Sequence, residues 1–171
     1  MRKTFIRMGV LGLLLGSLNS TLATAQTTSA IKPPIALRDD IKIENYMPVE
    51  KEAVRIFQNE QTGSIYYLSF TGEVYQIVEE NGKPKSVLLL TAKDHGIPRL
   101  QGAAFYKGKL FLSGNYNVNN NKGNKGRMVR YTFDSSGKPS NMVEVFNTVE
   151  YGANKTTFDH GWNALEISPD G

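Results

Sequence analysis

The chain has 171 residues, contains no cysteine and carries a formal net charge of +4. This length fits one ordinary domain. Without cysteine the chain cannot form disulfides, bind zinc through thiolates, attach haem covalently or carry a lipid on a cysteine.

The first 25 residues have the pattern of an export signal. Arg2, Lys3 and Arg7 precede the apolar run Met8–Leu18, and Ala23-Thr24-Ala25 follows it. Positive, apolar and small-residue segments in this order are typical of a secretory signal peptide. The alternative, a transmembrane anchor, needs about 20 apolar residues, and this run is shorter. We therefore predict a signal peptide over residues 1–25, a periplasmic or secreted location, and no membrane span after cleavage.

Cleavage would remove three basic residues and no acidic residue, which leaves a net charge of about +1. A chain so close to neutral has no electrostatic surplus for binding nucleic acid. We therefore expect no nucleic-acid partner.

Residues 26–51 are predicted to form a linker. Thr27-Thr28-Ser29 shows no periodicity, and Pro33-Pro34 favours an extended conformation. A weak edge strand over Ile41–Ile43 remains an alternative.

A first group of strands is predicted from residue 52 onward. Aromatic and β-branched residues, which suit a pleated and half-buried surface, alternate here with Gly-containing turns. The four predicted strands are Ala53–Gln58, Ile65–Phe70, Val74–Val78 and Ser86–Thr91.

A second group repeats this pattern. Its predicted strands are Leu100–Tyr106, Leu110–Ser113, Arg127–Phe133 and Met142–Phe146, with polar loops at Asn115–Gly126 and Tyr151–Thr157. The first loop is rich in asparagine, whose oxygens could bind calcium, but no cluster of carboxylates accompanies them, so a mobile loop is the expectation.

Similar turns occupy similar places in the two groups. The pairs are Gly63 with Gly108, Gly82-Lys83-Pro84 with Gly137-Lys138-Pro139, and Asp94-His95-Gly96 with Asp159-His160-Gly161. Four-stranded units that repeat in this way are typical of a β-propeller. A Greek-key sandwich is the alternative, but it gives no reason for matching turns.

The end of the sequence fits the start of a third unit. Leu165 and Ile167 alternate with polar residues, and Pro169-Asp170-Gly171 supplies a turn. The prediction is an all-β, incomplete propeller over residues 52–171, with about two antiparallel blades and the first strand of a third.

The two Asp-His-Gly turns precede the first strand of a unit, so in a propeller they would face the central channel. Histidine titrates near neutral pH and can accept a proton from a substrate hydroxyl. The alternative is that each turn is structural, with its histidine capping a strand end.

Asp159-His160, with its spacing to Leu165, Ile167 and Pro169-Asp170, resembles the soluble quinoprotein glucose/sorbosone dehydrogenases. The resemblance covers roughly residues 52–171. It extends upstream through Gly102-Ala103-Ala104-Phe105, Leu112-Ser113-Gly114 and Arg130-Tyr131-Thr132. Members of this family are six-bladed propellers that oxidise sugars with pyrroloquinoline quinone (PQQ).

The resemblance implies that His160 is the general base for the sugar hydroxyl and that Asp159 helps to hold the sugar. Ala164 stands where the family commonly has arginine, and Trp162 and Asn163 also differ from the pattern. The resemblance implies PQQ and calcium as cofactors, with most of their ligands in later blades. Residues 1–171 alone are therefore expected to be inactive.

Two further residues are candidates. Arg99 could bind an anionic edge of the cofactor, or be a solvated loop residue. Trp162 could stack on a sugar ring, or pack in the core or at a blade edge. The leading hypothesis is an exported PQQ-dependent sugar dehydrogenase. The alternative is a non-catalytic extracytoplasmic propeller that binds carbohydrate or protein.

Overall fold

The computed structural model describes residues 34–152 and 162–168. The chain divides into two units, Met1–Ile43 and Glu44–Gly171. In the described part of the first unit, the Arg38 guanidinium pairs with the Asp40 carboxylate at 2.5 Å. Residues 41–43 are not in a strand, so the alternative of an edge strand there is wrong.

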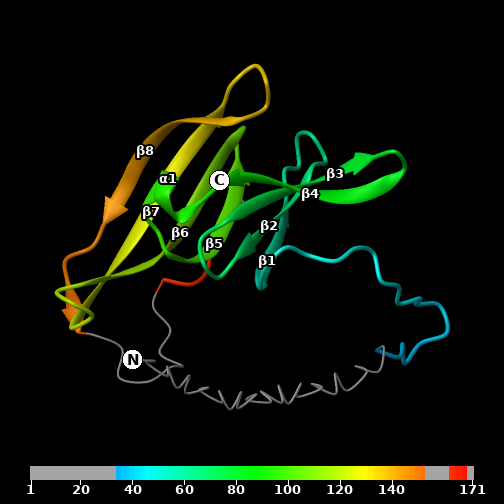
Figure 1. The fold of residues 1–171 in the computed structure, drawn as a ribbon, viewed down its shortest axis with the longest axis horizontal. Coiled ribbons are helices and arrows are strands. Elements are labelled where there is room, and N and C mark those ends of the chain that lie inside the picture. Colours follow the sequence, from blue (N-terminus) through cyan, green and yellow to red (C-terminus); the bar gives the residue numbers. More distant parts are fainter. Residues whose placement is uncertain (1–33, 153–161, 169–171) are drawn as a thin grey trace, which may run out of the picture. The chain divides into compact units, whose positions relative to one another are not determined.

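The first sheet has four antiparallel strands in sequence order (Figure 1). Turns with positive φ at Gly63, Gly72 and Gly82 connect them, and glycine adopts this conformation without steric cost. The predicted strands are confirmed, with small shifts at their ends. They are β1 (Ala53–Gln58), β2 (Ile65–Ser69), β3 (Val74–Glu80) and β4 (Lys83–Leu90).

The second sheet also runs in sequence order, and a short fifth strand pairs with β7. The polar loop predicted at Asn115–Gly126 is wrong. Strands β6 and β7 continue through most of it as a long hairpin, which turns at Asn119–Lys122. The strands are β5 (Arg99–Tyr106), β6 (Lys109–Val118), β7 (Gly123–Phe133), β8 (Pro139–Asn147) and β9 (Tyr151–Gly152).

A short helix, α1 (Ala92–His95), connects the two sheets. Thr91 and Asp94 form a capping box at its start, and Gly96 ends it in the left-handed conformation. The plain turn predicted at Asp94-His95-Gly96 is therefore wrong, because these residues belong to a capped helical turn.

The hydrophobic core lies where the sheets face each other. Phe57 on β1 stacks on Phe105 of β5, with ring centroids 5.7 Å apart, and Tyr66 on β2 packs against the same ring at a tilt, with centroids 4.9 Å apart. Such aromatic pairs add to the stabilisation from buried area. The buried members of the core are Leu68, Val74, Leu90, Ile97, Leu100, Ala103, Leu110, Leu112, Val129 and Tyr131.

The structure confirms the all-β class and two consecutive antiparallel sheets of four and five strands. Neither sheet closes, so the propeller remains a prediction. Residues 163–168 are not part of a strand, so the half-buried strand predicted around Leu165 and Ile167 is wrong for these residues. None of the helical structure seen in residues 34–152 and 162–168 has the length and apolarity needed to cross a bilayer.

Candidate functional site

The predicted site residues divide into two pairs. Asp159 and His160 lie outside the described residues. Arg99 and Trp162 are described, and both belong to a polar cluster at one end of the second sheet. This Arg99 cluster consists of Arg99, Asn115, Asn117, Asn124, Tyr151 and Trp162.

Arg99 is the first residue of β5 and is half-buried, so it is not a solvated loop residue. Its guanidinium donates hydrogen bonds to the side-chain oxygens of Asn117 on β6 and Asn124 on β7. Both acceptors are neutral amides. Among the described residues, no carboxylate forms an ion pair with Arg99, so these bonds fix the position of the charge without neutralising it.

Asn115 connects Trp162 to the sheet. It stands opposite Arg99 on one side and Gly126 on the other, and only 6% of it is exposed. Its side-chain oxygen accepts hydrogen bonds from the Trp162 backbone N–H at 3.0 Å and the Tyr151 hydroxyl at 2.7 Å. Its amide nitrogen donates to the Trp162 carbonyl at 3.4 Å. One buried asparagine therefore holds the Trp162 backbone on both sides.

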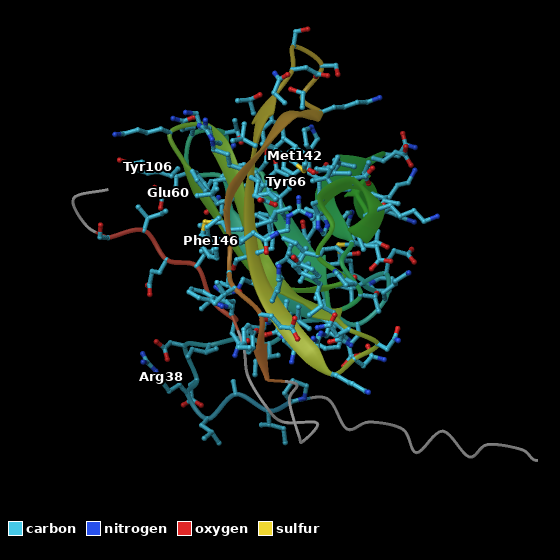
Figure 2. All side chains as sticks on the ribbon, turned by 90° about the vertical axis from the view of Figure 1, so that its left-hand side faces the viewer. Arg38, Glu60, Tyr66, Tyr106, Met142 and Phe146 are labelled. Carbon is cyan, nitrogen blue, oxygen red and sulfur yellow. The ribbon has the colours of Figure 1, made fainter. Side chains whose placement is uncertain are left out.

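The Trp162 indole lies against β8 and β7. Its ring is 5.0 Å from that of Phe146, which Figure 2 shows on β8, and it covers the backbone at Gly126 so closely that a Cβ there would collide with it. The side chain nevertheless remains 46% exposed. Its packing fixes the indole while part of its face stays open to solvent.

Tyr151 and Asn124 complete the cluster. Burial raises the pKa of the Tyr151 hydroxyl, and the nearby charge of Arg99 opposes this effect. The phenol is therefore neutral at physiological pH and donates its proton to Asn115. Asn124, which is 2% exposed, donates to the Gly152 carbonyl at 3.4 Å.

The arrangement suits a polar ligand with negative charge. A cation held by amides attracts a carboxylate or phosphate, and an exposed indole offers an apolar face for a sugar ring. In the described ranges, no three His, Asp or Glu side chains come close enough to hold a metal ion. The described part of the cluster thus has the chemistry of an anion contact.

His95 has a structural role. It is 1% exposed, and its Nε2 lies 2.8 Å from the Gly72 carbonyl oxygen, while its Nδ1 lies 3.2 Å from the Ile97 N–H. A carbonyl only accepts, so Nε2 carries the hydrogen and Nδ1 accepts from Ile97. For the first Asp-His-Gly turn, these contacts match the structural alternative.

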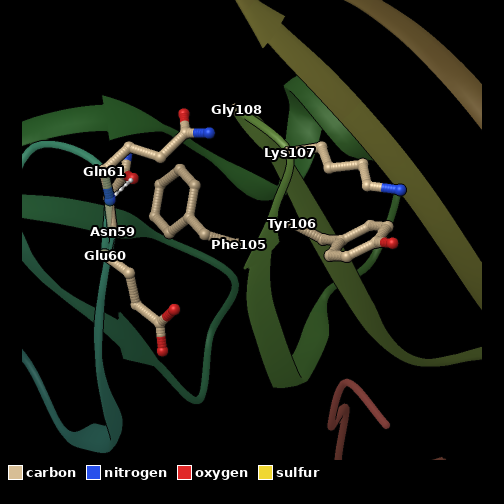
Figure 3. Close-up of a pocket in the computed structure, with 7 residues that line it drawn as sticks. All are labelled: Asn59, Glu60, Gln61, Phe105, Tyr106, Lys107 and Gly108. Carbon is tan, nitrogen blue, oxygen red and sulfur yellow. Dashed lines mark hydrogen bonds between the residues drawn. The ribbon is translucent and has the colours of Figure 1, made fainter. Parts of the chain in front are cut away.

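A separate pocket lies at the other end of β5 (Figure 3). At the usual rise per residue of a β-strand, the length of β5 puts it about 23 Å from Arg99. It has a volume of about 240 Å³ and lies between the turns that follow β1 and β5. The Phe105 ring lines it, and the Lys107 ammonium stands 4.7 Å from the centre of the Tyr106 ring. The remaining lining residues are Asn59, Glu60, Gln61 and Gly108.

Sequence reasoning missed Asn115, Asn117 and Asn124, because it assigned all three to a loop. Asn115 and Asn117 both lie on β6, and Asn124 lies on β7. Asn115 and Asn117 are two positions apart, so in a strand their side chains lie on one face of the sheet. Arg99 pairs with Asn115 and lies on that same face.

The sequence was also compared with known proteins. No family model matches the chain, and no curated protein gives a significant match.

Proposed function

We propose that the protein is an exported sugar dehydrogenase of the soluble quinoprotein glucose/sorbosone type. In this proposal His160 removes the proton from a sugar hydroxyl, while Asp159 and Trp162 hold the sugar. The fold part of the proposal is a β-propeller. Two consecutive sheets, each with β-strands in sequence order, agree with successive blades.

The observation that carries the proposal is the attachment of Trp162 beside Arg99. Asn115 joins the two, since it pairs with Arg99 across the sheet and hydrogen-bonds the Trp162 backbone. Asp159 and His160 precede Trp162 by only three and two residues in the sequence. Arg99 and Trp162 thus share one contact surface, and the proposed base His160 is close to Trp162 in the sequence.

The cofactor can be compared with the residues present. PQQ carries carboxylates, and Arg99, whose charge has no carboxylate partner among the described residues, fits such a group. The described residues hold no group of three or more His, Asp or Glu side chains, and the resemblance assigns most calcium ligands to later blades. When bound, the quinone would supply the acceptor for the hydride of the sugar.

The remaining roles belong to the protein. Arg99 would orient the anionic edge of the cofactor, and Trp162 would hold the sugar ring and exclude water from one side of it. His160 would accept the hydroxyl proton, a role that suits a group titrating near neutral pH.

The test is dye reduction by the full-length protein, reconstituted with PQQ and calcium, over a panel of aldoses. We expect turnover that requires the cofactor and falls by about 10² or more in His160→Ala, the scale of a lost general base. Trp162→Phe, which keeps an aromatic ring, serves as the matched variant and should change KM more than kcat. Full activity in His160→Ala would refute the assigned role.

The second candidate is a non-catalytic propeller that binds carbohydrate. The observation in its favour is the half-exposed Trp162 indole, whose backbone the Asn115 amide holds, since aromatic faces and amides bind sugars without any reaction. Sugar binding that depends on Trp162, with no turnover and no effect of His160→Ala, would establish this function instead.

A further inference from the structure

A cavity of about 320 Å³ lies between the first strands of the two sheets. It is lined by Val54 and Arg55 on β1, Gln101 on β5, and Asn163. The strands β1 and β5 lie side by side in the fold (Figure 1). The volume falls at the lower end of the range typical of small-molecule sites.

Two β-bulges frame this cavity. The pairing of β1 with β2 shifts register between Ala53 and Arg55, and that of β5 with β6 shifts between Leu100 and Gly102. The residues inside these irregularities are Val54 and Gln101, and both line the cavity. Bulges re-aim side chains and are concentrated beside functional sites. The first strand of each sheet thus has a bulge, and the bulged residue of each strand lines the same cavity.

Arg55 supplies a fixed positive charge. It is half-buried, and its Nε–H donates to the Gln101 carbonyl at 3.1 Å. A guanidinium has five N–H donors, so four remain on the terminal nitrogens. Across the portion of the chain that the structure describes, no carboxylate pairs with Arg55. The anchored Nε leaves the fork of terminal donors available to a carboxylate, which such a fork binds with two parallel hydrogen bonds.

Asn163 and Gln101 add neutral polar groups. The Asn163 side-chain oxygen is buried and has no hydrogen-bond partner among the described residues, so it is an unused acceptor for a ligand hydroxyl, and the amide nitrogen adds donors. The Gln101 amide offers both a donor and an acceptor. Hydroxyl groups, which donate and accept, suit such amides, while Val54 supplies an apolar wall.

We infer that this cavity, framed by the bulges at Val54 and Gln101, binds a small hydroxylated carboxylate of the sugar-acid type. Arg55 receives the carboxylate, and Gln101 and Asn163 receive the hydroxyls. The inference goes beyond the proposed function, because the binding requires neither turnover nor cofactor.

The test is calorimetric titration of the full chain with gluconate, without PQQ or calcium. Trp162, the only tryptophan, adjoins Asn163 and gives a second, fluorescent signal. Sorbitol, a neutral polyol, and inorganic phosphate are the comparison probes. We expect saturable binding of gluconate and at least tenfold weaker binding of both comparison probes.

The variants assign this binding to the cavity. Arg55→Met and Asn163→Asp should each weaken gluconate binding by about tenfold or more, because the first removes the cation and the second introduces a repelling charge. Arg55→Lys keeps the charge and loses the fork, so it should bind with intermediate affinity. Arg38→Gln removes one positive charge in the first unit and should bind as the unsubstituted chain does.

Arg55 also connects two strands, so circular dichroism should confirm that each variant is folded. If Arg55→Met does not fold, Arg55→Lys and Asn163→Asp decide the question. Equal affinity for sorbitol or phosphate, or unchanged gluconate binding in the variants that fold, overturns the inference. Gluconate binding should persist in His160→Ala, which separates this site from the proposed catalytic one. If His160→Ala abolishes gluconate binding while Arg55→Lys and Asn163→Asp leave it unchanged, gluconate binds at the proposed catalytic site and the inference is overturned.

Discussion

Replacing His95 with alanine should strongly destabilise the protein. The imidazole satisfies two backbone groups, the Gly72 carbonyl and the Ile97 N–H, in a site that is 1% exposed. An unsatisfied buried polar group costs about 1–3 kcal/mol, and the space left by the ring adds to this, so we expect a loss of about 3–5 kcal/mol. The measurement is the free energy of unfolding in urea. A loss below about 1 kcal/mol would refute the structural role.

The burial of His95 also predicts that the stability of the protein depends on pH. Burial lowers the pKa of His95 below 6.5, and Arg127 acts in the same direction, while the Gly72 carbonyl, Asp94 and Glu73 oppose it. The unfolded chain therefore binds the proton more readily. The stabilisation that the neutral His95 imidazole provides is complete above about pH 6.5. It declines as the pH falls toward the pKa that His95 has in the folded protein.

The slope in this window is at most about 1.4 kcal/mol per pH unit for one group. His160, the only other histidine in the sequence, provides the control. We expect His95→Ala to abolish the slope and His160→Ala to retain it. A slope that follows His160 and not His95 would contradict the assignment.

Three further predictions concern other buried contacts. Burial raises the pKa of Glu73, but hydrogen bonds from Lys51, Ser69 and Thr71 outweigh this and lower it to about 2. Glu73→Gln should therefore lower the free energy of unfolding by about 1–3 kcal/mol above pH 4.5. This loss should become progressively smaller as the pH falls through 2. Gly126→Ala should displace the Trp162 ring and shift its fluorescence, whereas the control Gly152→Ala, where a Cβ meets nothing, should not. Burial raises the pKa of Tyr131 to about 12, so its ultraviolet titration should lag behind that of free tyrosine, and stability should decline from about pH 10 upward.

The strands of the first sheet could be predicted because their signals are local. Ile65–Ser69 is dense in β-branched and aromatic residues, and glycines with positive φ mark the turns on either side. Helix α1 was missed although its signals are also local. Thr91 and Asp94 have the spacing of a capping box, and Gly96 has the place of a helix C-cap.

The long hairpin of β6 and β7 could not be predicted in the same way. Asparagine and glycine are depleted in strands, so the sequence favoured a loop. The structure compensates through contacts between residues far apart, such as Arg99 with Asn124 and Asn119 with Glu150. The predicted strand around Leu165 had the right alternation, but in the described residues no neighbouring strand pairs with it.

Of the candidate site, sequence reasoning identified Arg99 and Trp162 but not the residue between them. A buried asparagine that bonds a backbone 47 positions away has no local signature. The cavity at Arg55 was missed for a similar reason, because it depends on two bulges and a bulge changes register without changing composition.

The strand order described above has a consequence for the way the protein reaches its native state. Each of the strands β1 to β4 pairs with its neighbour in the sequence, and so does each of β5 to β8. Such pairings close short loops, which makes their entropic cost small and their formation fast. The first sheet can therefore assemble before β5 has been synthesised. The late steps are those that join the sheets, namely the packing of Phe57 and Tyr66 against Phe105. Substitutions at Phe105 would then mainly accelerate unfolding, whereas those within the β2–β3 hairpin would mainly slow folding.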